Sequence, residues 1–131
     1  MTEDGTATRG SGLATAGLVS LAAMRIGVGA LAWSNPDLTA KLFGFGEPDG
    51  QARYTWRLFG VRDVVVGLGT VTSRGRRRRA WATVGLVCDV ADGAAGVLGR
   101  GDVKPVSATA MVGVPAAAVG FGVWALTRRS R

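Results

Sequence analysis

Six charged side chains interrupt three stretches of the sequence that are otherwise apolar enough to cross a lipid bilayer. They are Arg25, Arg57, Arg62, Asp63, Asp89 and Asp92. An isolated charge at the centre of a membrane helix costs about 2.5–3.5 kcal/mol. Because three of these side chains are positive and three are negative, they must meet one another, water or a ligand inside the folded protein.

The apolar residues concentrate in four blocks. These blocks are residues 13–33, 54–72, 80–99 and 105–127. At about 1.5 Å per residue, each can cross a hydrocarbon core about 30 Å thick. The fourth block carries no charge, which disfavours the competing interpretation, a soluble four-helix bundle, because it leaves no polar face for water. We therefore predict an all-α fold: an integral membrane four-helix bundle formed by residues 13–127.

The segments outside the four spans have simple predicted roles. Residues 1–12 are rich in Gly, Thr and Ser and are expected to be a disordered cytoplasmic N-terminus, while residues 128–131 form a basic cytoplasmic tail. Between the first two spans, Asn35 before Pro36 predicts a helix start, followed by a short interfacial helix over residues 37–43. The sequence Ala-Leu-Ala at 30–32 resembles a signal-peptidase site, but the N-terminus lacks a basic region and Arg25 breaks the apolar stretch.

The basic residues outside the spans are distributed unequally between the two sides of the predicted bundle. One side has nine of them: Arg9, Arg74, Arg76, Arg77, Arg78, Arg79, Arg128, Arg129 and Arg131. The other side has four: Lys41, Arg53, Arg100 and Lys104. The positive-inside rule then predicts a multi-pass protein of the cell inner (plasma) membrane with both termini in the cytoplasm.

The arginine-rich segment over residues 73–79 is interpreted first as a topology determinant. It also predicts contact with anionic lipid head groups, so the expected partners are the lipid bilayer and a possible membrane protein or second copy of the chain. Nucleic-acid binding is not expected of a seven-residue loop between two spans.

Glycines inside the spans predict close packing of the helices. Gly60, Gly67, Gly85 and Gly96 are the expected packing positions, because small residues let helix backbones approach one another in a membrane. Helical periodicity places Gly85 and Gly96 on the same face of the third span as Asp89 and Asp92. That face is therefore expected to point into the bundle.

The charges are expected to form one buried network, with five of them near the bilayer centre and Arg57 about 10 Å toward the outside. Asp89 and Asp92 are three residues apart and share a helix face. Arg62 and Asp63 diverge by about 100° around their helix and cannot serve the same partner helix. One arrangement sets Arg25 and Arg62 against Asp89 and Asp92, with Asp63 meeting Arg57 or Arg25. The network could be structural, or it could surround a polar pocket open to the outer side.

Missing residue types exclude several chemistries. The chain has no histidine and a single cysteine, Cys88, which excludes histidine-bound haem, histidine–metal sites, Ser-His-Asp catalysis and thiol redox pairs. We therefore expect that the chain binds no metal ion and no cofactor, and that it is not an enzyme by itself.

The segment Arg-Leu-Phe-Gly-Val-Arg-Asp over residues 57–63 follows an arginine in the first span and an outer segment with Asn-Pro and Phe-Gly-Phe. This order of elements resembles small four-helix bacterial membrane proteins of the DoxX/DoxD-like group, in particular a subset of unknown function. The resemblance implies a four-helix membrane bundle. Some relatives are associated with quinol oxidation or thiol-redox complexes.

Three functions remain open on this basis, the last of them a subunit of a redox enzyme. The first is a non-enzymatic membrane protein whose buried Arg/Asp network holds the bundle, acting as an accessory subunit of a larger complex. The second is a carrier or binding protein for a small anionic or quinone-like ligand, with Arg25, Arg57 and Arg62 as receptors for its charge.

Overall fold

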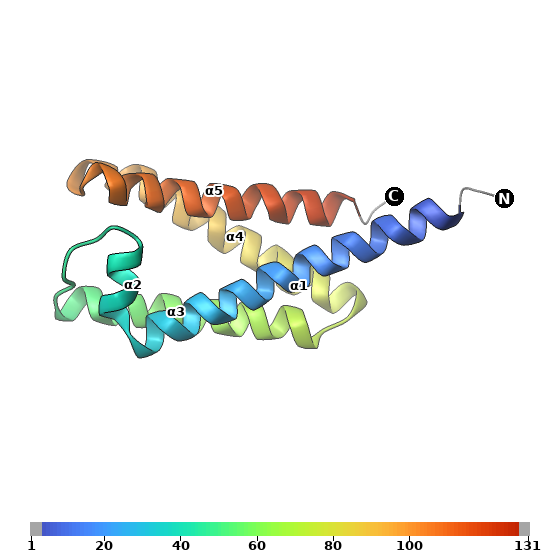
Figure 1. Cartoon of the computed structure of the whole chain (residues 1–131), viewed down its shortest axis with the longest axis horizontal. Helices are drawn as coiled ribbons and strands as arrows, with labels where there is room; N and C mark the ends of the chain where they lie inside the picture. The colour runs from blue at the N-terminus through green and yellow to red at the C-terminus, as the bar shows by residue number, and fades with distance from the viewer. Residues whose placement is uncertain (1–3, 129–131) are drawn as a thin grey trace.

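A computed structural model describes residues 4–128, and this part of the chain is almost entirely helical (Figure 1). The helices are α1 (Asp4–Ser34), α2 (Pro36–Leu42), α3 (Gly50–Thr72), α4 (Gly75–Gly99) and α5 (Pro105–Thr127), with a 3-10 turn, Arg100–Asp102, before α5. The described residues contain no β-strand. The all-α class predicted from the sequence is confirmed.

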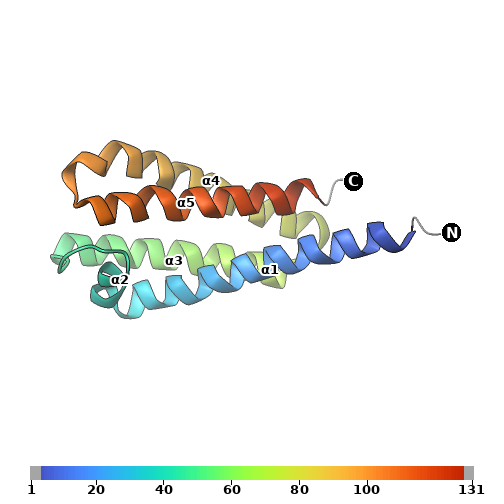
Figure 2. The same cartoon turned by 45° about the horizontal axis from the view of Figure 1, so that its top comes forward.

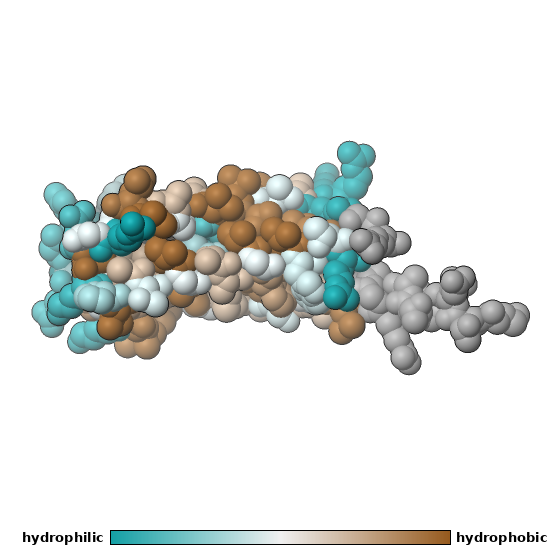
Figure 3. Space-filling model, turned by 90° about the horizontal axis from the view of Figure 1, so that it is seen from above, coloured by the Kyte–Doolittle hydropathy of each residue, from teal (hydrophilic) through white to brown (hydrophobic). Residues whose placement is uncertain are grey.

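Three helical segments are long and apolar enough to cross a membrane: Gly12–Ser34, Gly75–Asp102 and Pro105–Thr127. Helix α3 has the same length as α5, 23 residues, but it is interrupted by charges and is not among the three. On the face seen in Figure 3, apolar residues occupy the middle of the molecule and hydrophilic residues gather at its two ends. These features indicate a membrane protein.

The four long helices are arranged as two pairs, with α1 packed along α3 and α4 packed along α5 (Figure 2). The pairs meet at the end of the molecule where both chain ends lie (Figure 1). There, the rings of Phe121 and Trp124 lie over Gly17, and the indole of Trp81 lies over Gly69. The connection from α1 through α2 to α3 lies at the opposite end.

The α1–α3 pair is held by direct contact between helix backbones. A Cβ atom added to Gly29 would lie 2.6 Å from the carbonyl oxygen of Gly60, and one added to Gly67 would lie 2.6 Å from Cγ1 of Ile26. No side chain larger than hydrogen fits at these positions without moving a helix. This is the close packing that small residues permit between membrane helices.

Helix α2 begins as the sequence predicts. The Asn35 side chain accepts a hydrogen bond from the backbone N–H of Leu38 at 3.0 Å, and Pro36 is the first helical residue. Thr39 and Ala40 are fully buried, so α2 is anchored to the bundle by one face.

Three helices begin earlier than the sequence suggested. Helix α3 starts at Gly50 instead of residue 54. Helix α1 starts at Asp4, within the stretch expected to be disordered, because a helix already nucleated gains one hydrogen bond for each residue that extends it; residues 1–3 lie outside the described part. Helix α4 starts at Gly75, so most of the arginine-rich segment is helical. Nε of Arg78 donates to the carbonyl oxygens of Thr70 at 3.2 Å and Ser73 at 2.9 Å, which otherwise lack partners at the end of α3.

Candidate functional site

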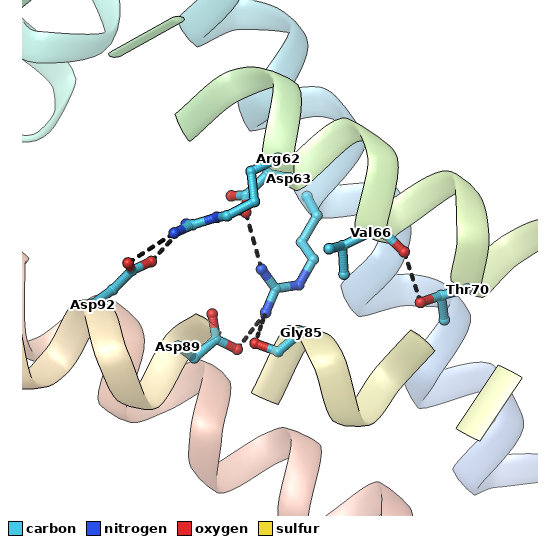
Figure 4. A network of polar contacts seen from close by, with 8 residues as sticks. Arg62, Asp63, Val66, Thr70, Gly85, Asp89 and Asp92 are labelled. Carbon is cyan, nitrogen blue, oxygen red and sulfur yellow. Dashed lines mark hydrogen bonds and ion pairs between the residues drawn. The ribbon is translucent and has the colours of Figure 1, made fainter. Parts of the chain in front are cut away.

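Five of the six predicted network residues meet between α1, α3 and α4 (Figure 4). Helix α1 contributes Arg25, α3 contributes Arg62 and Asp63, and α4 contributes Asp89 and Asp92. Arg25 faces inward because it lies in a buried stripe of α1 with helical spacing. The other members of this stripe are Ala14, Leu18, Ala22, Gly29 and Ala32.

Arg25 links α1 to both other helices. Its Nη1 donates to Oδ1 of Asp63 at 3.2 Å, and its Nη2 donates to Oδ2 of Asp89 and to the carbonyl oxygen of Gly85 at 3.2 Å (Figure 4). The side chains of Arg25 and Asp89 are only 8% and 9% exposed. Gly85 makes this contact possible, since a Cβ atom there would lie 3.3 Å from Nη2.

Arg62 links α3 to α4 through a bidentate ion pair. Its Nη1 and Nη2 donate to Oδ1 and Oδ2 of Asp92 at 2.9 and 2.6 Å, the parallel geometry that suits arginine and carboxylate best. The guanidinium carbon lies 4.7 Å from the centre of the Phe59 ring, and Nη2 also reaches Oδ1 of Asp63 at 3.4 Å. Nε of Arg62 is buried and has no hydrogen-bond partner among the described residues.

Arg57 lies apart from this network. Its side chain is exposed, and its Nε donates to the carbonyl oxygen of Trp33 at 3.4 Å. Asp63 therefore meets Arg25, and the three arginines do not converge on one point. The assembled network contains two arginines and three aspartates, so its formal net charge is −1.

A large cavity extends from the network toward the α2 end of the molecule. Its volume is about 650 Å³, and its walls come from all four long helices and the segment after α2. All five network residues line it. The remaining walls are mostly apolar, with Met24, Val28, Met111 and Val114 among them.

Four aromatic side chains line the same cavity, and three of them contact the fourth, Trp56. The Trp56 ring centre lies 5.6 Å from that of Phe43, 5.7 Å from that of Phe45 and 6.3 Å from that of Phe59. We call Phe43, Phe45, Trp56 and Phe59 the aromatic cluster. Since Phe59 also stacks on Arg62, the cluster leads from the outer end of the cavity to the charges.

The segment after α2 is attached to α5 across this end of the molecule. The hydroxyl of Ser107, which is 1% exposed, donates to the carbonyl oxygen of Gly44 at 2.6 Å. Gly44 has a positive φ of 78°, a conformation that favours glycine. Ser107 therefore fixes the position of the two phenylalanines that flank Gly44.

The other predicted positions are also accounted for. Gly60, Gly67, Gly85 and Gly96 are all buried at helix contacts, and four of the arginines in the basic segment, Arg74, Arg76, Arg77 and Arg79, are exposed. In the described part of the chain, no group of three His, Cys, Asp or Glu side chains could hold a metal ion. Sequence reasoning named a polar pocket beside the network as one of two alternatives, but it missed the mostly apolar walls of the cavity and the role of Ser107, while Phe-Gly-Phe was noted only as part of a resemblance.

Comparison with protein-family models, with curated proteins and with solved structures finds no match for this chain. The similarity to the DoxX/DoxD-like group stays a prediction.

Proposed function

We propose that the chain is a four-span protein of the cell inner (plasma) membrane, in which α3 is the second span. The support comes from the direction of its charges. Arg62 and Asp63 pair with residues of α1 and α4, whereas the exposed positions of α3 in the same region are apolar: Val61, Val65 and Leu68. Charges that face the interior of a bundle are compatible with a membrane span.

The proposed orientation has both termini and the start of α4 in the cytoplasm, as the excess of arginine on that side favours. The exposed arginines there would contact anionic lipid head groups. After replacing Cys88 by alanine, a cysteine at Gly50 should react with an impermeant maleimide in intact cells, and a cysteine at Arg76 should not. The reverse labelling pattern would contradict the orientation.

The function that the site supports best is binding of a small molecule within the bundle, without catalysis. The observation that carries this proposal is the cavity of about 650 Å³ that ends on the charge network. Binding sites for small molecules are typically about 300–1,000 Å³, mostly apolar, with a few polar groups that orient the ligand. The cavity has this composition.

The charge network also supports a structural role. Arg25–Asp89 and Arg62–Asp92 each join the α1–α3 pair to α4, and they do so where the two helix pairs border a partly open cavity instead of packing tightly. We therefore assign the network both tasks, holding the bundle and closing the inner end of the cavity. The DoxX/DoxD-like resemblance suggests an accessory subunit of a larger complex. Such a subunit could bind at this site a ligand that other subunits of the complex also use.

The binding role is tested by extracting the protein into lipid nanodiscs directly from its membrane and identifying co-purifying small molecules by mass spectrometry. The matched control is Ala95→Phe, which adds a ring at a cavity-lining position of α4. A small molecule should be enriched with the wild type and lost with the variant. Identical small-molecule contents in both preparations would contradict the proposal.

A further inference from the structure

We infer that the cavity takes a small, mostly apolar molecule that carries one positive charge. This inference rests on the binding function proposed above and specifies the chemical class of the ligand.

The wall of the cavity carries an excess of negative charge. The charged side chains that line it are the five of the network, two arginines and three aspartates, so the wall has one negative charge in excess. Helix α5, which closes the other side, has no charged residue from Pro105 to Thr127, and Arg57 does not line the cavity. In surroundings of low dielectric constant, an excess charge strongly favours a ligand of opposite sign.

Asp63 is the carboxylate that has no arginine partner of its own. Arg25 and Arg62 each have a close partner of their own, in Asp89 and Asp92. Asp63 is shared between the two arginines at longer distances, 3.2 and 3.4 Å, and both contacts end on its Oδ1. Among the described residues, Oδ2 of Asp63 receives no hydrogen bond. Asp63 lines the cavity, and its side chain is 20% exposed.

The aromatic cluster also favours a positively charged ligand. Faces of tryptophan and phenylalanine rings attract cations, and tryptophan does so most strongly. Trp56 contacts both Phe43 and Phe45, and these rings line the same cavity as the network, so the rings and the excess carboxylate both favour a cation. Both arginines already have a carboxylate partner, so Nε of Arg62 is the buried guanidinium donor left for an anion among the described residues of the network.

The test uses three phenyl-substituted probes of different charge; the two ions share one tetrahedral shape, and the neutral probe has three phenyl rings. They are tetraphenylphosphonium (positive), tetraphenylborate (negative) and triphenylphosphine oxide (neutral). Their binding is measured by isothermal titration calorimetry on the protein in phosphatidylcholine nanodiscs, with empty nanodiscs subtracted because all three partition into lipid. The phosphonium should bind at least about tenfold more tightly than either other probe, as expected for one unit charge at short range in a medium of reduced dielectric constant.

Two substitutions of Asp63 separate charge from folding. Asp63→Asn leaves one carboxylate for each arginine, so it should fold while losing about tenfold or more in phosphonium affinity. Asp63→Glu keeps the charge and should retain the preference. If Asp63→Asn does not fold, the ranking of the three probes on the wild type and on Asp63→Glu decides.

The outcomes distinguish this inference from the proposed function. If tetraphenylborate or the phosphine oxide binds more tightly than the phosphonium, and Ala95→Phe abolishes that binding, the cavity is a ligand site but the cation inference is wrong. If Asp63→Asn folds and binds the phosphonium as tightly as the wild type does, the inference is also wrong. If none of the probes binds beyond empty nanodiscs, or Ala95→Phe leaves their binding unchanged, the binding function itself fails.

Discussion

Replacing Arg25 by glutamine should destabilise the protein more than any removal of a single aspartate. Arg25 links α1 to both other helices of the network, with ion pairs to Asp63 and Asp89 and a hydrogen bond to the carbonyl oxygen of Gly85. Without it, one arginine faces three aspartates. Breaking a buried ion pair by removing one partner typically costs about 3–5 kcal/mol, a large part of the roughly 5–15 kcal/mol that stabilises a domain.

The effect can be measured as thermal unfolding followed by the reaction of Cys88, the only cysteine, with a thiol-reactive fluorophore. Cys88 is half-buried, so its reactivity should rise when the bundle opens. At about 3 °C per kcal/mol for a chain of this size, Arg25→Gln should lower the melting temperature by about 10 °C.

The double variant Arg25→Gln with Asp89→Asn separates lost charge balance from lost packing. It restores the wild-type excess of one negative charge, and the two neutral amides can still hydrogen-bond to each other. It should therefore recover much of the stability lost in Arg25→Gln, which would be a favourable coupling between the two sites. The reasoning would be refuted if Arg25→Gln melted like the wild type, or if the double variant were as unstable as the sum of both single variants.

Two further predictions concern the packing around the cavity. Gly60→Leu should cost about 3 kcal/mol or more, since its Cβ would collide with the backbone of α1 and overpacking is destabilising, whereas Gly27→Leu, at a position with open space, should melt like the wild type. Ser107→Ala removes the hydrogen bond to Gly44 and should cost about 1 kcal/mol, with faster amide hydrogen exchange over residues 43–49; unchanged exchange there would show that this bond does not hold the segment.

The charge network was accessible from the sequence because its members obey helix periodicity. Asp89 and Asp92 lie on the same face of α4 as Gly85 and Gly96, and Arg25 lies in a stripe of small buried residues on α1. Side chains on such stripes point into a bundle whatever its detailed packing. The need to offset charges at membrane depth then limits which residues can be neighbours.

Arg57 shows where this reasoning stops. It lies five residues before Arg62, which corresponds to about 140° around an α-helix, so the two side chains point in different directions. Near a helix end, a long arginine side chain can reach a polar region instead of a buried partner, and Arg57 meets the carbonyl oxygen of Trp33. The sequence did not distinguish this outcome from participation in the network.

The size and the mostly apolar walls of the cavity were not predictable, because they depend on how the two helix pairs are oriented. Contacts such as Trp81 over Gly69 and Phe121 over Gly17 close the pairs together at one end. At the other end, the Ser107–Gly44 bond bridges them across the segment that follows α2. None of these three contacts follows from hydropathy, periodicity or charge alone.

The central claim is that the charged helix α3 crosses the membrane with its charges turned inward. Electron paramagnetic resonance of a nitroxide at Val65, an exposed position near the depth of the network, tests it in reconstituted vesicles, with Gln51 at the start of α3 as the control. We predict that oxygen, which concentrates in the bilayer, relaxes the Val65 label strongly and that a water-soluble nickel chelate does not, with the opposite ranking at Gln51. A Val65 label as accessible to the nickel chelate as the Gln51 label would contradict the membrane placement of α3 and of the network it carries.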